Sequence, residues 1–294
     1  MRARPLACLL SLQLLTAAVL AAPAGKPQRP RRVVSQSVGT DELLMAVADP
    51  GQIAGLSHLS QDPTFSVDPK LASAFPKLKS SDAESVLALR PDLVLAASYT
   101  QPETLALLRR AGVPLIIAEK FDTLPKVYEN LRAVGRAVGH QERAEQVIAD
   151  AQQRVAALAK ALAGVKPVRV LSASTYPFTA GAETTFQDLC DHAGALNVAA
   201  EAGLRGHVPT PEERVSTWTP EVLIASGEEG KDPAEVAARL AQLPAYRALP
   251  ALAQGRLLLV PGPLMASVTH HRIAAFEWLA RRLHPERFKP PTAP

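Results

Sequence analysis

Cysteine is scarce in this sequence. Of 294 residues only Cys8 and Cys190 are cysteines, and Cys8 lies in an N-terminal segment that we expect to be removed. Cys8 also stands too early in its apolar run to be a lipid-attachment cysteine. The remaining chain would hold Cys190 alone, which excludes an internal disulfide and leaves the fold to its hydrophobic core. Cys190 lies in a helical pattern, and we expect it to be a small buried residue.

Aromatic residues and an excess of one charge are also missing. Aromatic residues make up 4% of the chain, so each one in a candidate binding loop is informative. The net charge is +4, and two of the positive charges, Arg2 and Arg4, lie in the removable segment. This charge is too small for a typical nucleic-acid-binding protein. Hydrophobic residues reach 47% and charged residues 20%, which is typical of a folded globular protein.

Motifs that bind phosphate or build a hydrolase nucleophile are absent as well. The sequence has no G-x-G-x-x-G stretch after its first predicted strand and no G-x-x-x-x-G-K-[ST] loop. It also lacks the G-x-S-x-G elbow. Together with predicted export, these absences argue against an enzyme that depends on cytosolic nucleotides. We expect a protein with no catalytic residues and no cofactor of its own.

The first residues predict export. Residues 1–24 are typical of a secretory signal peptide, because Arg2 and Arg4 precede an apolar run over 6–22 and small residues follow it. This run is shorter than the roughly 20 residues of a membrane span, and polar residues interrupt it. We therefore predict a periplasmic location, with residues 25–32 forming a basic, proline-rich tether.

One phrase occurs twice. "AESVLALRPDLVLAAS" covers residues 83–98, and "EERVSTWTPEVLIASG" covers residues 212–227. Each contains a Glu, a Pro seven residues later, an acidic residue and an apolar run. The proline ends a short helix, and the apolar run is typical of a parallel strand that is buried on both faces. The repetition predicts one supersecondary unit that is used once in each half of the chain.

The rest of the pattern predicts two α/β lobes. Strands alternate with helices over residues 33–123 and again over residues 166–286, which favours a parallel sheet in each half. Residues 124–165 between them are helical, and they include an uninterrupted run over 141–163 that would be about 35 Å long. Apolar residues recur along this run at helical spacing, so we expect one buried face.

Further predictions concern the cap of the first helix, the C-terminal tail and three histidines. Thr40 could cap the first helix, and residues 287–294 would form a disordered tail. His140 lies in a turn and His284 near the tail, so we expect both to face solvent. His192 lies in a helical pattern, where a structural role is favoured.

The order and spacing of several segments carry a family resemblance. The chain resembles the periplasmic substrate-binding proteins of ABC importers for iron chelates, haem and cobalamin. The segments are "RVVSQSVGTDELLMAV" with "GQIAGLS", both copies of the repeated phrase, "LLRRAGVPLI", the long helical run, and "PFTAG" followed by "LCDHAGALNV". The resemblance implies two Rossmann-like lobes joined by a single long rigid α-helix, and a monomer that binds its ligand in the groove between the lobes.

The same resemblance assigns a role to the two glutamates of the repeated phrase. In this family an exposed Glu on each lobe docks to arginines of the permease, and the motif places these at Glu84 and Glu213. An importer permease dimer would be the protein partner. The alternative is that each Glu only favours the dipole at the start of its helix. At the second site the adjacent Glu212 could substitute for Glu213.

Candidate ligand contacts lie in loops that follow the carboxyl ends of strands, where open α/β sheets bind ligands. They are Tyr99, Tyr176, Phe178, His58, His207 and His270. Tyr99 is the preferred contact, because a tyrosine phenolate can ligate ferric haem and a histidine can ligate haem iron or cobalt. His270 and His271 would open the final helix, where neighbours point about 100° apart, so both could not face the groove. Arg205 and Arg272 either attract a ligand carboxylate or are surface charges.

The transported ligand would be a small-molecule metal chelate, namely a ferric siderophore, haem or cobalamin. Two alternatives remain. A related group of binding proteins captures bare zinc or manganese with converging histidines and carboxylates, although this sequence has no His-rich loop. The other alternative is a two-lobed exported enzyme.

Overall fold

Two parallel sheets form the cores of two lobes. The computed structural model describes residues 29–227 and 232–288. The N-terminal sheet has the order β2-β1-β3-β4, and the C-terminal sheet has the order β10-β9-β5-β7. The strands are β1 (Val33–Ser35), β2 (Ile53–Gly55), β3 (Leu93–Ala97), β4 (Leu115–Ala118), β5 (Val168–Ser172), β7 (Ala195–Asn197), β9 (Val222–Gly227) and β10 (Leu257–Pro261). Read from β2 and from β7, the two orders correspond strand for strand, so the halves share one topology.

Helices cover both faces of the N-terminal sheet. Val33, Leu93 and Leu95 belong to the buried cluster that includes α1 (Val38–Val47) and α5 (Leu124–Val138). The intervening residues Val34 and Val94 pack instead with α3 (Ala83–Ala88) and α4 (Pro102–Arg110). Because both sides of these strands are buried, their sequences show continuous apolar runs rather than alternation. The prediction of parallel, doubly covered strands is therefore confirmed.

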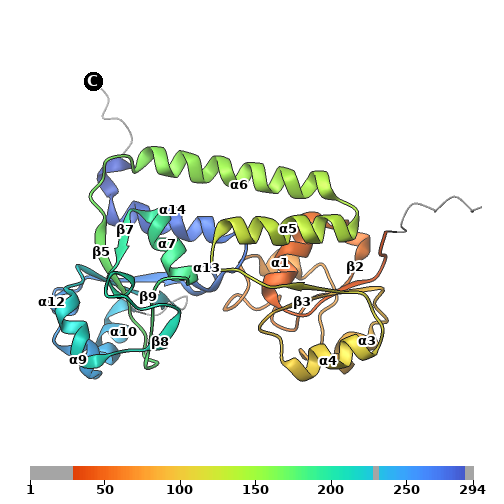
Figure 1. Ribbon diagram of the computed structural model, residues 1–294, viewed down its shortest axis with the longest axis horizontal. Helices are drawn as coiled ribbons and strands as arrows, with labels where there is room; N and C mark the ends of the chain where they lie inside the picture. Colours follow the sequence, from red (N-terminus) through yellow and green to blue (C-terminus); the bar gives the residue numbers. More distant parts are fainter. Residues whose placement is uncertain (1–28, 228–231, 289–294) are drawn as a thin grey trace, which may run out of the picture.

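The long helix α6 (Gln141–Ala161) runs across both lobes (Figure 1). Its 21 residues span about 30 Å, and α5 and α14 (Arg272–Leu283) lie beneath it. Arg143 near its start donates hydrogen bonds to the carbonyls of Val47 and Ala48 in the N-terminal lobe. Arg154 in its second half pairs with Glu277 of α14. One helix thus holds both lobes, as predicted.

Each copy of the repeated phrase forms the same unit. Helix α3 leads into β3, and α9 (Glu212–Val215) with the 3-10 turn η2 (Ser216–Trp218) leads into β9. Strands β3 and β9 hold corresponding places in their sheets. The C-terminal lobe adds an antiparallel ribbon of β6 (Phe178–Ala180) and β8 (His207–Pro209).

Two further helices, α7 (Thr185–Ala193) and α10 (Pro233–Leu240), pack on the C-terminal sheet. The other helices are shorter. They are η1 (Pro50–Gln52), α2 (Pro69–Ala72), α8 (Val198–Glu201), α11 (Pro244–Arg247), α12 (Pro250–Ala253), α13 (Gly262–Ala266) and η3 (Pro285–Arg287). Cys190 in α7 is fully buried, as expected. Within residues 29–227 and 232–288, no helix is both long and apolar enough to cross a membrane.

Some sequence predictions were wrong. Helix α1 begins at Val38 with Ser37 as its cap, and Thr40 lies inside the first turn, where its hydroxyl completes the capping box. His284 does not face solvent, because its ring contacts the Gly194 carbonyl at 2.8 Å from Nε2 and is 5% exposed. The side chain of His140 is 12% exposed and lies 2.9 Å from Asp49. Arg287 ends an ordered turn rather than opening a disordered tail.

The end of the predicted tether is bound to the N-terminal lobe. The backbone amides of Arg31 and Arg32 donate to Asp92, and the Gln52 side chain donates to the Pro30 carbonyl. These contacts were not expected of a free linker. The predicted signal peptide, residues 1–24, and the last part of the predicted tail, residues 289–294, lie outside the described residues.

Candidate functional site

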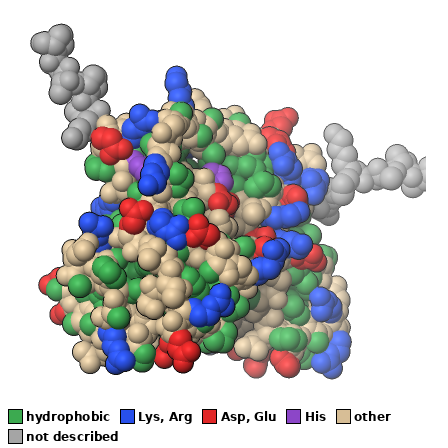
Figure 2. Space-filling view, turned by 60° about the vertical axis from the view of Figure 1, so that its left-hand side comes forward, with side chains coloured by type: hydrophobic (Ala, Val, Ile, Leu, Met, Phe, Trp, Pro, Cys, Tyr) green, Lys and Arg blue, Asp and Glu red, His purple; other side chains and the backbone are tan. Residues whose placement is uncertain are grey.

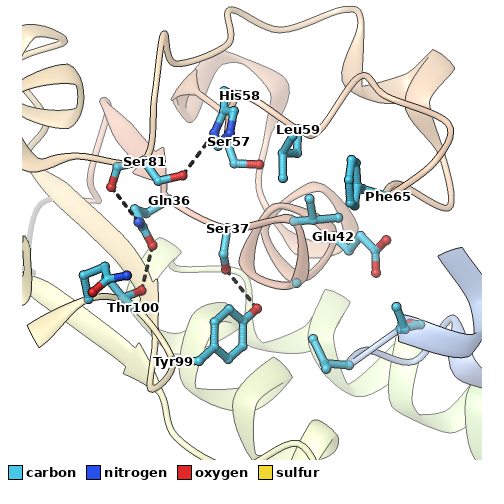
Figure 3. Close-up of a pocket in the computed structure, with 16 residues that line it drawn as sticks. Gln36, Ser37, Glu42, Ser57, His58, Leu59, Phe65, Ser81, Tyr99 and Thr100 are labelled. Carbon is cyan, nitrogen blue, oxygen red and sulfur yellow. Dashed lines mark hydrogen bonds between the residues drawn. The ribbon is translucent and has the colours of Figure 1, made fainter. Parts of the chain in front are cut away.

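A cavity of about 400 Å³ lies where the two lobes meet (Figure 3). Most of its walls come from segments that follow strands β1, β2 and β3, so it lies at the carboxyl edge of the N-terminal sheet. The C-terminal lobe contributes residues 266–268, at the end of α13 and just after it. The complete lining is Gln36, Ser37, Val38, Gly39, Glu42, Ser57, His58, Leu59, Phe65, Ser81, Tyr99, Thr100, Gln101, Ala266, Ser267 and Val268.

Hydrogen bonds hold one wall of the cavity in place. The Thr100 hydroxyl donates to Gln36 Oε1 at 2.7 Å, and Gln36 Nε2 donates to the Ser81 carbonyl at 2.7 Å. Ser81 Oγ lies 3.0 Å from Nδ1 of His58. Figure 3 shows this chain of contacts running from the end of β3 to the loop after β2. The network links four connecting segments of one lobe and fixes His58 through one ring nitrogen.

Tyr99 lies between the two lobes. Its hydroxyl donates to Ser37 Oγ at 3.3 Å, and its ring centroid lies 5.7 Å from that of Phe121. The side chain is 58% exposed, so much of the ring is open to a ligand. Burial raises the pKa of Tyr99, the hydrogen bond to Ser37 opposes the rise, and the charges of Asp41 and Glu42 add to it. Without a ligand the phenol therefore stays protonated at neutral pH.

Two buried carboxyl groups, Asp41 and Glu42, lie at the start of α1, and neither was predicted from the sequence as a site residue. Glu42 lines the cavity and is 3% exposed. Its Oε1 accepts a bond from the Val67 amide at 3.3 Å, and its Oε2 accepts one from the Thr269 hydroxyl of the C-terminal lobe at 2.6 Å. Asp41 is fully buried and accepts bonds from the amide and hydroxyl of Ser57. Acidic residues near the start of a helix are common, so the only signal in the sequence was that Asp41 and Glu42 follow β1 closely.

Burial changes the ionisation of both carboxyl groups. It raises the pKa of Glu42 to about 7, and the negative charge of Asp68 adds to the effect. It also raises the pKa of Asp41 to about 7, although bonds from Ser35 and Ser57 oppose the rise. The charge of this side of the cavity therefore changes near neutral pH.

The predicted ligand contacts fall into two groups. His58 and Tyr99 line the cavity. Tyr176, Phe178 and His207 lie on the β6–β8 ribbon or just before it and do not line the cavity. Tyr176 is 76% exposed and Phe178 is 48% exposed, so both present aromatic surface to solvent.

His270 does not belong to the cavity lining either. The final helix begins at Arg272, so His270 and His271 precede it, and their ring centroids are 4.2 Å apart. The expectation that helical geometry would separate these two side chains was therefore wrong. Burial lowers the pKa of His270 to about 3, and the positive charges of His271 and Arg154 add to the effect.

Arg272 is not a surface charge, and it does not line the cavity. Its guanidinium lies 2.9 Å from Asp188 Oδ2, and both side chains are almost completely buried. It also donates to the carbonyls of Phe121 and Ser267. Burial raises the pKa of Asp188 and lowers that of Arg272. Arg272 therefore ties α14 to α7 and to the segment before α5. Arg205, in contrast, is exposed and pairs with Glu183.

The predicted docking glutamates are exposed. Glu84 lies in α3 and Glu213 in α9, and both helices lie on the side of their lobes away from α6 (Figure 1). Figure 2 shows basic and acidic side chains interspersed over the face that it displays, without a continuous patch of one sign. Among the described residues, no group of three or more His, Cys, Asp or Glu side chains is placed to hold a metal ion.

Comparison with known proteins gives a consistent result. The family model described as "Periplasmic binding protein" matches residues 33–264. A cobalamin-binding protein of Halobacterium salinarum is 26% identical over 235 residues, which cover 79% of this chain and 63% of that protein. The chain thus spans less than two thirds of that relative. A vitamin B12-binding protein of Yersinia pseudotuberculosis is 28% identical over 210 residues, which cover 69% of this chain and 72% of that protein.

Solved structures share the fold. The apo form of the periplasmic haem-binding protein RhuT from Roseiflexus aligns with a TM-score of 0.74 and 25% identity, covering 87% of this chain and 99% of that one. The periplasmic vitamin B12-binding protein BtuF of Vibrio cholerae aligns with a TM-score of 0.69 and 19% identity, covering 89% of this chain and 99% of that one. The prediction of two lobes with parallel sheets joined by a long helix is confirmed.

Proposed function

This chain belongs to the periplasmic binding protein family, and on that premise we propose that it captures a metal chelate outside the cytoplasm and delivers it to an ABC importer. The observation that carries the proposal is the cavity at the junction of the lobes, because residues of both lobes line it. Relatives are named for cobalamin or vitamin B12, and structural neighbours for haem or vitamin B12. The candidate ligands are therefore cobalamin, haem and, from the family resemblance, a ferric siderophore.

The cavity has the mixture of surfaces that a bulky chelate needs. Apolar walls come from Leu59, Phe65 and Val268, and polar anchors come from hydroxyl and amide side chains. A cavity of about 400 Å³ would hold only part of such a ligand. We propose that the rest extends along the groove toward the exposed ring of Tyr176 and its neighbours Phe178 and His207. Tyr99 would pack its ring against the chelate.

Delivery would use the two exposed glutamates. Glu84 and Glu213 would each meet an arginine of a permease dimer, one glutamate from each lobe. Exposed ion pairs of this kind contribute only about 0.2–1 kcal/mol, which suits repeated docking and release. The carrier would act as a monomer in the periplasm, after removal of the predicted signal peptide. Members of this family are binding proteins rather than enzymes, which agrees with a carrier that does not transform its ligand.

Visible absorption tests the proposal. The purified mature protein is titrated with cyanocobalamin, haem and a ferric hydroxamate, and bound ligand is separated from free ligand by equilibrium dialysis. One chelate should bind at a 1:1 ratio and be recovered unchanged, and Tyr99→Ala should weaken its binding. Binding of zinc or manganese alone would favour the bare-metal alternative, and turnover of the chelate would favour the enzyme. If none of the three chelates binds, the proposed function is wrong.

A further inference from the structure

The 16 described residues of the cavity lining include an acidic side chain but no Lys or Arg. Glu42 is the one carboxylate of this lining, and its hydrogen-bond partners are the uncharged Thr269 hydroxyl and the Val67 amide. Asp41, the residue before it, is also buried and is bonded to Ser57, which is uncharged. No cationic side chain of the lining balances these two acids.

The uncharged polar groups of the lining can accept hydrogen bonds. Six of the lining residues carry hydroxyl groups and two, Gln36 and Gln101, carry amides. Each oxygen of a carboxylate can accept two bonds. Glu42 accepts one described bond at each oxygen, so both oxygens retain acceptor capacity. A ligand edge that carries N–H groups would find partners here.

A ligand carboxylate, in contrast, would be repelled by the acidic side chains of this cavity. Like charges brought together in a partly desolvated site repel one another more strongly than they do in water. A carboxylate would also lose water without gaining a cationic partner, and that loss is expensive in a buried site. Thr269 holds Glu42 at the junction of the lobes, so the carboxyl group is not free to turn out to solvent.

We propose that this cavity takes the edge of the chelate that carries carboxamides or other uncharged N–H donors, and that it discriminates against chelates with free carboxylates at that edge. The inference rests on the proposed function, since it concerns which chelates the same site accepts. It separates the candidate ligands by their chemistry. A corrinoid bears peripheral carboxamides, whereas haem bears two carboxylates.

Two matched pairs of probes test the inference. The first pair is cyanocobalamin and its monocarboxylic acids, in which one carboxamide is hydrolysed. The second pair is haem and haem dimethyl ester. Dissociation constants are measured at pH 8 for the full mature protein. The uncharged member of the pair that binds should bind at least about tenfold more tightly, which corresponds to about 1.4 kcal/mol.

Two variants test the cause. Glu42→Gln keeps an acceptor oxygen for the Val67 amide, and the Thr269 hydroxyl can reverse its bond, so the fold should be retained, as circular dichroism would check. This variant should reduce the preference for the uncharged probe. Gln101→Arg adds a cation to the lining at a side chain that makes no capping bond, and it should favour the carboxylate probe. Gln153→Arg, on the exposed face of α6, adds the same charge elsewhere and should leave the preference unchanged.

The outcomes are distinct. Equal or tighter binding of the carboxylate member by the wild-type protein would overturn the inference. So would a preference that neither Glu42→Gln nor Gln101→Arg changes. If all four probes fail to bind the wild-type protein while a ferric hydroxamate binds, the inference is overturned and the proposed function stands. If the ferric hydroxamate fails as well, the proposed function is overturned too.

Discussion

Arg90 and Thr219 adopt the same unusual backbone conformation at corresponding points of the two lobes. Their φ angles are 49° and 47°, and each directly precedes a proline, Pro91 or Pro220. Residues other than glycine rarely adopt positive φ. A residue before proline also avoids the right-handed helical region, so the helix has to end there. The repeated phrase therefore encodes the same chain reversal in each lobe, which delivers β3 and β9 to equivalent positions.

The first prediction concerns Glu84 and Glu213, which lie in the helices that precede these two chain reversals. Glu84→Ala combined with Glu213→Ala should impair uptake while ligand affinity stays unchanged, because both side chains are exposed and away from the cavity lining. Each exposed ion pair is worth about 0.2–1 kcal/mol, so we expect a reduction in permease binding of roughly two- to thirtyfold for the pair. Transport into proteoliposomes and affinity by equilibrium dialysis are measured in parallel.

The control is Glu103→Ala, which removes another exposed glutamate from the first turn of α4. It should transport like the wild-type protein. A loss of ligand affinity in the double variant would contradict the docking role. Because Glu212 is also exposed beside Glu213, the triple variant that includes Glu212→Ala shows whether this neighbour substitutes.

The sequence predicted much of the fold because the signals for parallel strands are local. Strand β3 is buried at all five positions, as the apolar run of residues 93–97 predicts. The long helix was also predictable, since the chain over residues 141–163 contains neither Pro nor Gly. Its observed end at Ala161 differs by two residues, as helix ends commonly do.

The parts of the site that the sequence did not reveal depend on distant partners. Glu42 bonds to Thr269, which is 227 residues away in the chain, and Arg272 pairs with Asp188 across 84 residues. Residue type and spacing say nothing about such pairings. His58 and Tyr99 follow strands β2 and β3 and line the cavity, whereas His270 precedes α14 and does not line it.

A buried glycine in the cavity lining, Gly39, gives the second prediction. A side chain at Gly39 would place its Cβ 2.4 Å from Cγ2 of Val268 and 3.2 Å from the Tyr99 hydroxyl oxygen. Valine is stiff, so Gly39→Ala must displace one of these two lining residues. We expect chelate affinity to fall roughly tenfold, because overpacking of this kind costs about 1–3 kcal/mol. Gly51→Ala is the matched control, since nothing lies within 4 Å of its added Cβ. Equal affinities in the two variants would show that Gly39 does not shape the site.

The buried pair of Asp188 and Arg272 gives the third prediction. Asp188→Ala leaves the guanidinium buried without its carboxylate partner, and such changes cost about 3–5 kcal/mol of the free energy of unfolding. Urea unfolding followed by circular dichroism measures the loss. The double variant Asp188→Ala with Arg272→Met should be more stable than Asp188→Ala alone, because no unpaired charge remains. Arg205→Ala removes one member of an exposed pair and should change stability by less than about 0.5 kcal/mol. A small loss in Asp188→Ala would contradict a structural role for the pair.

The fourth prediction concerns pH and follows from the carboxyl groups at the start of α1. The pKa values of Asp41 and Glu42 are raised to about 7, from ordinary values of 3.8 and 4.5. Between these values the folded protein keeps protons that the unfolded chain releases, so stability falls as pH rises through this window. The groups that face Glu42 are Asp41, Asp68 and Tyr99, and a negative charge on any of them favours the protonated form.

Melting temperatures of the wild-type protein and Glu42→Gln, measured from pH 5 to pH 8, test this dependence. The wild-type protein should lose more stability over that range, because the amide that Glu42→Gln introduces has no proton to release. His58 also lines the cavity, so the comparison is repeated in a His58→Gln background. Glu103→Gln, an exposed control, should follow the wild-type curve. Parallel curves for the wild-type protein and Glu42→Gln would mean that Glu42 is ionised throughout, and that burial at the lobe junction does not hold its proton.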